Sequence, residues 1–433
     1  MMNGKWRMMN GEWQVANGME LNCPICKKRT FKPFFELNDV PVQDGLLWDS
    51  QEEALKSPLG DIKLAFCRSC GYVGNRSFEP EKIKYDQTYS FSLHFSPTYQ
   101  EFIDQLAARL VETYQLRDKT ILEIGCGRGD FLRSLCKLGH NKGLGIDPAA
   151  SQRANEQNSP LWGVRGASQR ISEITFVQDF YSEKYADQES DFICCRHVLD
   201  QLPDPKTFVE LVRQNIGSRS KTVVYFEAPN AVNIFQDLLI RNIIYEKSSW
   251  FTAYSISRLF ELSGFEVLAV EPCYEAGQYL GIEVIPQGDV PVPTASQRVS
   301  GRRSKAGGQG DNLDYFSQLV VAFAENYERK TKTWRNQLAA MQQAGQRAIA
   351  WGAGSGAISF FNTLKINEQI PFVVDINPNR QGKFLPLTGQ QVVPPEFIQA
   401  FQPDLIVITN PTYEKEIREQ VASLGVTCSY WSI

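Results

Sequence analysis

The chain has 433 residues, of which 42% are hydrophobic and 22% are charged, and its net charge at pH 7 is −4. These values are typical of a soluble globular protein that is too long for one ordinary core, so we expect two or three domains. The charge argues against a nucleic acid or an anionic membrane as partner, and no apolar run reaches the roughly 20 residues of a membrane helix. Residues 1–20 lack the apolar core of a signal peptide, so we expect a disordered leader on a cytoplasmic protein.

Four cysteines near the N-terminus form two C-x-x-C pairs, Cys23 with Cys26 and Cys67 with Cys70. Such a pair aims two thiolates at one point, which suits tetrahedral zinc, and a redox role would need only one pair. The segment between the pairs is longer than in most zinc ribbons, so it must loop out. We predict a structural zinc site that holds together a small domain over residues 21–80.

The next predicted domain, residues 81–288, contains an alternation of strands and helices. Apolar residues at helical spacing predict a helix over 98–115, and from residue 120 strand-like runs alternate with helices, which is typical of a parallel sheet covered on both faces. Residues 265–286 contain two further strand-like runs joined by a turn. An antiparallel hairpin at the end of a parallel sheet is the usual ending of a class I methyltransferase, so we predict an α/β fold with this doubly wound sheet.

Residues 289–312 are rich in Pro, Gly, Ser and Arg and are predicted to form a linker. A long amphipathic helix is expected over 313–344, followed by a second, smaller alternation of strands and helices. We therefore predict a Rossmann-like α/β domain over 313–433.

Two glycine turns could hold a cofactor: ILEIGCGRGDF at 121–131 and AWGAGSGA at 350–357. Each follows an apolar strand, and each meets an aspartate about twenty residues later, Asp147 or Asp375. In the first turn, the carboxylate of Glu123 would repel a pyrophosphate but suits the ammonium and sulfonium groups of S-adenosylmethionine. The second turn lacks this acid, and amides at a helix N-terminus attract a phosphate. We assign S-adenosylmethionine to the first turn and leave NAD, a phosphate-bearing substrate or packing open for the second.

The predicted cofactor site lies along the carboxyl ends of the first three strands. Glycines at 125, 127 and 129 let the backbone approach the ligand, and Asp147 is placed to accept hydrogen bonds from both ribose hydroxyls. Asp179 and Phe180 are expected to flank the adenine, and Tyr89 either closes over the cofactor or packs. The full predicted set is Tyr89, Glu123, Gly125, Cys126, Gly127, Gly129, Asp147, Pro148, Asp179, Phe180 and Arg196.

The cysteine knuckles, LEIGCGRGDFL, FEAPN, IIYEKSSWFTAYSISRLFELSGFEV and WGAGSGA, in this order, resemble the sugar C-methyltransferase family of deoxysugar biosynthesis and its bacterial relatives. The resemblance runs from about residue 21 to the end. It implies a zinc-binding domain, a class I S-adenosylmethionine domain and a C-terminal domain that helps to bind the acceptor. It also implies methyl transfer to carbon in a small molecule, often a nucleotide-linked keto-sugar, which makes a phosphate-bearing acceptor one option.

Carbon methylation beside a carbonyl needs a base and a group that stabilises the enolate. Where the family typically has Tyr-Glu-His or His-Glu-His, this chain has Tyr-Glu-Lys at 245–247, and Gln201 replaces another histidine. A lysine acts as a base only where its surroundings lower its pKa, so we favour Lys247 as an electrostatic clamp with a neighbour moving the proton. The predicted catalytic set is Tyr245, Glu246, Lys247, His94 and His197.

Three alternatives stay open. The acceptor atom could be oxygen or nitrogen, where deprotonation demands less of the protein. The chain could bind the cofactor without catalysis, in which case Lys247 and Gln201 mark lost chemistry. It could also be an NAD-dependent oxidoreductase that uses the 350–357 turn, which titration with S-adenosylmethionine and with NAD would reveal.

Overall fold

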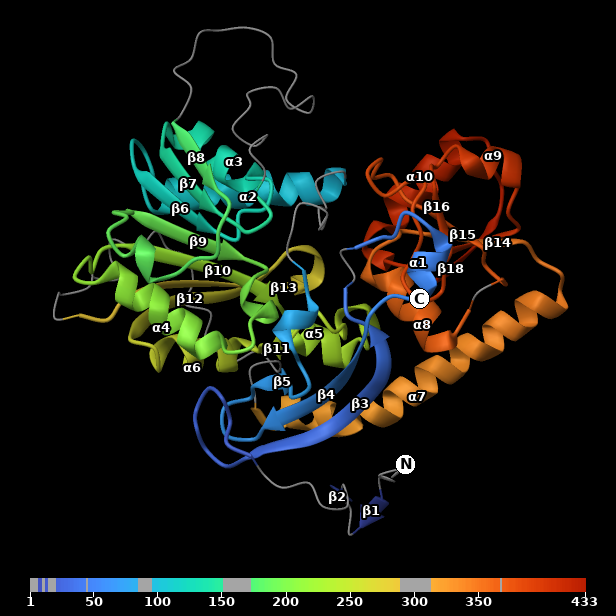
Figure 1. Ribbon diagram of the computed structural model, residues 1–433, viewed down its shortest axis with the longest axis horizontal. Coiled ribbons are helices and arrows are strands. Elements are labelled where there is room, and N and C mark those ends of the chain that lie inside the picture. The colour runs from blue at the N-terminus through green and yellow to red at the C-terminus, as the bar shows by residue number, and fades with distance from the viewer. Residues whose placement is uncertain are drawn as a thin grey trace, which may run out of the picture.

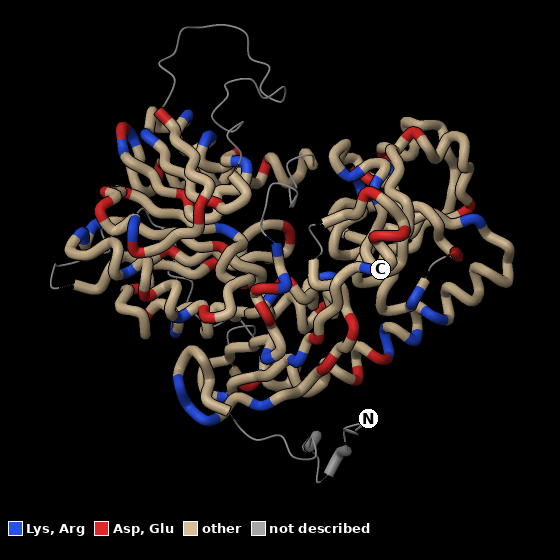
Figure 2. Tube along the Cα trace, viewed as in Figure 1, with Lys and Arg blue, Asp and Glu red and all other residues tan. Residues whose placement is uncertain are grey.

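The computed structural model describes residues 7–9, 12–14, 21–43, 46–84, 96–150, 173–288, 313–366 and 368–433. The predicted site residues Tyr89 and His94, and the predicted linker 289–312, lie outside this described part of the chain. The described strands form four sheets (Figure 1). Lysine and arginine are interspersed with aspartate and glutamate over the described part of the trace (Figure 2).

The largest sheet has seven strands in the order β12-β13-β10-β9-β6-β7-β8. The five strands from β10 to β8 run parallel, whereas β13 is antiparallel to both β10 and β12. This order, with its reversed last hairpin, is that of a class I methyltransferase, so the predicted fold class is confirmed. The strands are β6 (Thr120–Ile124), β7 (Lys142–Ile146), β8 (Ile174–Val177), β9 (Phe192–Arg196), β10 (Val223–Pro229), β12 (Phe265–Cys273) and β13 (Tyr279–Pro286).

Helices cover both faces of this sheet because successive strand residues point to opposite sides. Phe192 and Cys194 of β9 pack with α2 and α3, while Ile193 and Cys195 pack with α4 and α6. Ser96 caps α2 by accepting a hydrogen bond from the Tyr99 amide. The helices are α2 (Pro97–Thr113), α3 (Asp130–Gly139), α4 (Pro205–Ile216), α5 (Ala231–Gln236) and α6 (Ala253–Glu261).

The N-terminal sheet is antiparallel, in the order β11-β5-β4-β3. Its strand β11 comes from a much later segment of the chain. Its strands are β3 (Phe31–Pro41), β4 (Leu59–Cys67), β5 (Val73–Asn75) and β11 (Ser249–Trp250). The segment between β3 and β4 contains α1 (Gln51–Leu55) and reaches the C-terminal domain, where Trp48 exchanges two backbone hydrogen bonds with Phe384. In the leader, β1 (Arg7–Met9) pairs with β2 (Glu12–Gln14).

The C-terminal sheet is parallel, in the order β16-β15-β14-β17-β18, and the long helix α7 leads into it (Figure 1). At one end of α7, Phe316 packs edge-on against Phe66 of the N-terminal sheet, and at the other Trp334 packs against Phe360. One hydrophobic core therefore joins the two domains. The elements are α7 (Leu313–Gln343), β14 (Ala348–Trp351), α8 (Ser355–Leu364), β15 (Phe372–Val374), β16 (Gln391–Val393), α9 (Phe397–Phe401), β17 (Leu405–Ile408), α10 (Glu414–Ser423) and β18 (Ser429–Ser432).

Short 3-10 helices complete the described secondary structure. They span Pro80–Lys82, Glu183–Tyr185, Leu199–Gln201, Ile240–Asn242, Glu275–Gly277 and Pro411–Tyr413.

Candidate functional site

The first glycine turn joins β6 to α3 at the carboxyl edge of the seven-stranded sheet. Gly125, Gly127 and Gly129 have φ angles of 71°, 51° and 78°, a region that side chains with a Cβ disfavour. A Cβ at Gly127 would meet no atom within 4 Å, so the turn leaves room beside its backbone. Asp147, at the end of β7, accepts hydrogen bonds from the amides of Gly127 at 2.8 Å and Ala149 at 2.7 Å. The turn and Asp147 thus form one cradle.

Glu123 lies under this cradle and supplies a test of whether the cofactor fits. Its side chain is buried, and its Oε2 atom has no hydrogen-bond partner among the described residues. Burial raises the pKa of Glu123 to about 8 even though the charge of Arg196 opposes the shift. A buried carboxylate oxygen without a partner is costly unless a cation reaches it. The ammonium group of S-adenosylmethionine fits this requirement, whereas a pyrophosphate does not.

The other described cofactor candidates differ in their surroundings. The amide of Asp179 donates to the Asp147 carbonyl at 3.2 Å, which brings the ends of β7 and β8 together. The Asp179 carboxylate accepts from the Tyr185 hydroxyl and pairs with Lys184, while the neighbouring Phe180 is 64% exposed. The Phe180 ring therefore has an open face for an adenine.

Cys126 and Pro148 complete this part of the predicted set. Burial raises the pKa of the Cys126 thiol above its usual range, so Cys126 behaves as a small hydrophobic residue. The carbonyl of Pro148 accepts a hydrogen bond from Gln178 at 3.2 Å.

Arg196 and His197, at the end of β9, share the carboxylate of Glu227 on β10. One guanidinium nitrogen of Arg196 lies 2.9 Å from Glu227 Oε1 and 3.1 Å from the Tyr99 hydroxyl. The Nε2 atom of His197 lies 2.7 Å from the same carboxylate oxygen, and the Tyr225 hydroxyl donates to the other. Burial alone would raise the pKa of Glu227, but the charge of Arg196, with His197, lowers it to about 2. Glu227 is therefore an anion that lies against both Arg196 and His197.

Sequence reasoning assigned no role to Glu227. A signal was present, because Glu227 follows an apolar run at the carboxyl end of a predicted parallel strand, where ligands of such sheets bind. The backbone reinforces the arrangement: the His197 amide donates to the Glu227 carbonyl at 2.9 Å, and His197 has a left-handed φ of 56°. Its ring stands edge-on to Tyr279 at 4.4 Å between centroids and keeps an exposed fraction of 30%.

The residues at 245–247 do not converge on one point. The Tyr245 hydroxyl accepts from the Glu79 amide at 3.0 Å, so it faces the N-terminal sheet. Glu246 is also buried. Lys247 instead reaches the loop after β9, where its Nζ atom lies 3.5 Å from Asp200 Oδ2. The Gln201 amide group donates to the His197 carbonyl at 3.2 Å, so Lys247 and His197 flank one short loop.

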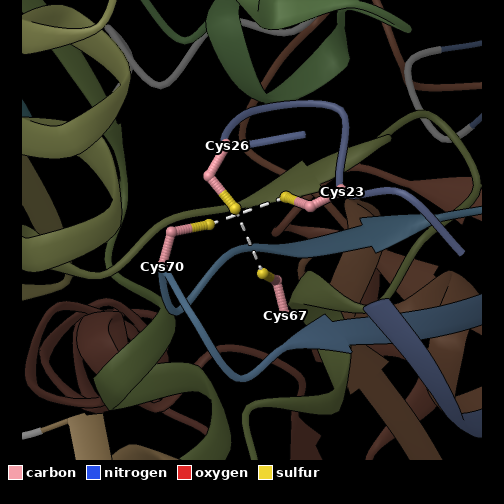
Figure 3. A group of neighbouring side chains, drawn as sticks. All are labelled: Cys23, Cys26, Cys67 and Cys70. Carbon is pink, nitrogen blue, oxygen red and sulfur yellow. Dashed lines mark hydrogen bonds between the residues drawn. The ribbon is translucent and has the colours of Figure 1, made fainter. Parts of the chain in front are cut away.

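The four knuckle cysteines gather at one point at the end of β4, where Cys67 is the last residue of that strand (Figure 3). Their sulfur atoms all lie within 4.8 Å of one another, with Cys23 and Cys70 at 3.6 Å and Cys26 and Cys67 at 3.6 Å. Zinc–sulfur bonds of about 2.3 Å in a tetrahedron place sulfurs roughly 3.8 Å apart. The donor set and its spacing therefore fit a tetrahedral zinc ion.

The second glycine turn has the same pattern of hydrogen bonds from backbone amides to an aspartate as the first. Asp375 accepts from the amides of Ala353 and Asn377, each at 2.8 Å, as Asp147 does in the first turn. Ala350 takes the strand position that Glu123 has in β6, and Arg380 lies 3.7 Å from the Asp375 carboxylate. The second turn therefore lacks the buried acid of the first and has an arginine beside its aspartate.

Family models match two parts of the chain. Residues 96–270 match a model described as a methyltransferase domain, and residues 310–429 match a C-methyltransferase C-terminal domain. Together with the strand order, these matches show that the chain carries a class I methyltransferase domain. The predicted enzyme class, an S-adenosylmethionine-dependent methyltransferase, is confirmed at this level.

Two curated relatives match shorter stretches. A ubiquinone biosynthesis O-methyltransferase from Pasteurella multocida is 26% identical over 140 residues, which cover 31% of this chain and 57% of that protein. A mitochondrial ubiquinone biosynthesis O-methyltransferase from Dictyostelium discoideum is 28% identical over 101 residues, which cover 22% and 31%. The chain thus spans less than two thirds of either relative.

Solved structures also resemble part of the chain. A methyltransferase from Aquifex aeolicus is 17% identical and covers 48% of this chain and 100% of its own, with a TM-score of 0.33. Magnesium protoporphyrin IX methyltransferase from Synechocystis, solved with bound S-adenosylmethionine, is 15% identical and covers 44% and 80%, with a TM-score of 0.32. Among the described residues, no helix is both long and apolar enough to span a membrane.

Proposed function

We propose that this protein transfers the methyl group of S-adenosylmethionine to a carbon beside a carbonyl in a small-molecule acceptor. The observation that carries the proposal is the buried oxygen of Glu123 that has no hydrogen-bond partner beneath an open glycine turn. This oxygen favours a cationic ligand, and S-adenosylmethionine carries an ammonium group. The match of residues 310–429 to a C-methyltransferase C-terminal domain favours carbon over oxygen or nitrogen as the methylated atom. The resemblance to sugar C-methyltransferases makes a nucleotide-sugar-like or natural-product carbonyl compound the first acceptor class to test.

The cofactor supplies an electrophilic methyl group, so the protein must make the acceptor carbon nucleophilic. We assign the removal of the proton to His197, whose Nε2 atom lies 2.7 Å from the Glu227 carboxylate and whose side chain keeps an exposed fraction of 30%. Lys247, whose Nζ atom lies 3.5 Å from Asp200 on the loop that follows His197, stabilises the enolate oxygen that forms when the proton leaves. The carbon–carbon bond would form as the sulfur–methyl bond of S-adenosylmethionine breaks, which leaves S-adenosylhomocysteine, and the proton would pass from His197 to water.

We also propose that the four knuckle cysteines bind one structural zinc ion. The support is the convergence of four sulfurs at tetrahedral spacing. The site lies beside β11, which residues 249–250 contribute to the N-terminal sheet, so the metal would steady the segment that carries Lys247.

The atom that receives the methyl group distinguishes the proposal from its alternatives. S-adenosylmethionine labelled with carbon-13 in its methyl group is incubated with the protein and a panel of keto-sugar nucleotides and simpler ketones. The proposal expects a product whose labelled methyl carbon has the chemical shift of a carbon-bound group. An oxygen- or nitrogen-bound methyl would assign the alternative chemistry, and cofactor binding without any product across acceptors would favour lost catalysis.

A further inference from the structure

The turn between β12 and β13 has a strained backbone. Tyr274, Glu275, Ala276 and Gly277 follow one another with positive φ angles of 56°, 24°, 52° and 77°. Only the last is a glycine, and this region of φ is unfavourable for residues that carry a Cβ atom. Such a backbone persists only where its surroundings hold it, and strained residues cluster at functional sites. The contacts around the turn therefore bear on what it positions.

The methyltransferase domain holds the backbone of this turn. The side-chain amide of Asn230 donates to the Gly277 carbonyl at 2.9 Å, and that of Asn233 donates to the Ala276 carbonyl at 3.1 Å. Both asparagines lie at α5, so the two bonds stay within one domain.

The C-terminal domain holds the side chains of the turn. The Tyr274 hydroxyl donates to the Tyr413 hydroxyl at 2.8 Å, and the side-chain amide of Gln278 donates to the Thr412 hydroxyl at 2.7 Å. Tyr413 and Thr412 belong to the short 3-10 helix between β17 and α10. Two hydrogen bonds therefore join this helix to the turn across the domain boundary.

Tyr274 connects the interdomain hydrogen bond to the proposed base. Its side chain is buried, and its ring is stacked on that of Tyr279, with 5.2 Å between centroids and 13° between the ring planes. The Tyr279 ring stands edge-on to the ring of His197 at 4.4 Å. Tyr413, Tyr274, Tyr279 and His197 therefore form a continuous series of contacts from the C-terminal domain to His197.

The same part of the C-terminal domain also holds α2. Glu416 of α10 accepts hydrogen bonds from the Ser96 hydroxyl and the Thr98 amide, each at 3.0 Å. Tyr99, in the first turn of α2, stands edge-on to the ring of Tyr274 at 5.5 Å. The C-terminal domain thus contacts both elements that pack around Tyr274.

We propose that Tyr413 is a positioning residue for methyl transfer, which acts through Tyr274 to fix the Tyr279 ring against His197. Edge-to-face packing of two rings favours one relative orientation, so a fixed Tyr279 restricts the imidazole. The assignment rests on the proposed function for the role of His197 as the base. It gives the C-terminal domain a part in shaping the catalytic centre, apart from any contact with the acceptor.

The test records the histidine ring signals by NMR in the full-length protein labelled with carbon-13 histidine. The chain has three histidines, and the signal that His197→Gln removes is that of His197. Tyr413→Phe and Tyr274→Phe each remove a hydroxyl and keep the ring. Both should shift the His197 ring-proton signal in the same direction, because the Tyr279 ring moves relative to the imidazole. The double variant should shift it no further, since both changes remove the same hydrogen bond.

Tyr327→Phe is the matched control, because the Tyr327 hydroxyl lies 3.2 Å from that of Thr363 within the C-terminal domain. It should leave the His197 signal unchanged. Thr412→Val removes only the neighbouring bond to Gln278 and should give a smaller shift, and it decides the question if Tyr413→Phe does not fold. An unchanged His197 signal in folded Tyr413→Phe, or an equal shift in Tyr327→Phe, would overturn the proposal.

Turnover gives the second readout. On an acceptor that the wild type methylates, Tyr413→Phe should lower kcat roughly tenfold because the base is misplaced, while S-adenosylhomocysteine affinity stays normal. A shifted His197 signal with unchanged kcat would also overturn the positioning role. Absence of methyl transfer by the wild type would count against the proposed function alone, because the histidine signal is recorded without acceptor or turnover.

Discussion

The Nζ atom of Lys247 lies 3.5 Å from Oδ2 of Asp200, whose side chain is only 2% exposed. The same nitrogen donates to Asn242 Oδ1 at 3.2 Å. A cation held by a buried carboxylate and an amide oxygen has a fixed position. This geometry agrees with Lys247 as a clamp on an anion rather than as the base.

Replacement of Lys247 tests the clamp. Lys247→Met should lower turnover by roughly 100-fold or more, the effect of losing one group that stabilises an oxyanion, while S-adenosylhomocysteine affinity stays normal. Lys247→Arg should keep part of the rate because the charge survives. Since Lys247→Met strands Asp200 as a buried anion at a cost of about 3–5 kcal/mol, the Asp200→Asn/Lys247→Met double variant controls for stability. Wild-type turnover in Lys247→Met would remove this residue from the site.

His197 is expected to carry the proton. His197→Gln should reduce turnover by roughly 10²–10⁴-fold while S-adenosylhomocysteine affinity stays normal, because an amide side chain cannot take up the substrate proton. His140→Gln is the matched control, since His140 has a similar left-handed φ of 55° and is exposed. Wild-type turnover in His197→Gln would reassign the base, with His94 as the next residue to test.

We predict that cofactor binding releases a proton from the side chain of Glu123. Its pKa of about 8 means that the free protein holds Glu123 mostly protonated at pH 7, and an ammonium placed beside it lowers that pKa. Binding therefore expels a proton, and affinity for S-adenosylhomocysteine should rise with pH from about 6 toward 8. Calorimetry in buffers of different ionisation enthalpy measures this directly. Glu123→Gln should release no proton, and equal proton release in both proteins would refute the assignment.

The cysteine cluster predicts one zinc ion per chain. Cys67→Ser/Cys70→Ser should lose the metal and lower the thermal unfolding temperature, because metal binding contributes to the folding free energy of such a domain. Cys428→Ser, which changes a partly exposed cysteine of the C-terminal domain, should affect neither. Elemental analysis that finds no zinc in the wild type, or a double variant as stable as the wild type, contradicts a structural metal.

Much of the fold follows from patterns within short windows. The strand and helix alternation after residue 120 and the final hairpin were predicted because each element has its own apolar period. The helix predicted over 98–115 is α2, and the one over 313–344 is α7. The convergence of the four cysteine sulfurs was predicted because each C-x-x-C pair already aims two thiolates at one point. The predicted cofactor residues were grouped by one rule, that the carboxyl ends of parallel strands meet at the same edge of the sheet.

The rest depends on contacts between distant residues, which one sequence does not display. Two residues, Ser249–Trp250, form β11 in the N-terminal sheet, and a strand this short has no readable period. The direction of the Tyr245 hydroxyl follows from that docking. Glu416 of α10 accepts from Ser96 and the Thr98 amide at the start of α2, a cap supplied from a different domain. The roles of the site residues stay predictions until the variants are measured.

The central claim, that the first glycine turn holds the cofactor and the second does not, is tested most directly by titrating S-adenosylhomocysteine into Asp147→Ala and Asp375→Ala. The two changes are matched, because each removes a carboxylate that accepts a backbone amide of its turn at 2.8 Å. We predict that Asp147→Ala weakens binding by about 1.5–3 kcal/mol, roughly tenfold or more, and that Asp375→Ala binds within twofold of the wild type. Normal affinity in Asp147→Ala together with loss in Asp375→Ala would contradict the account.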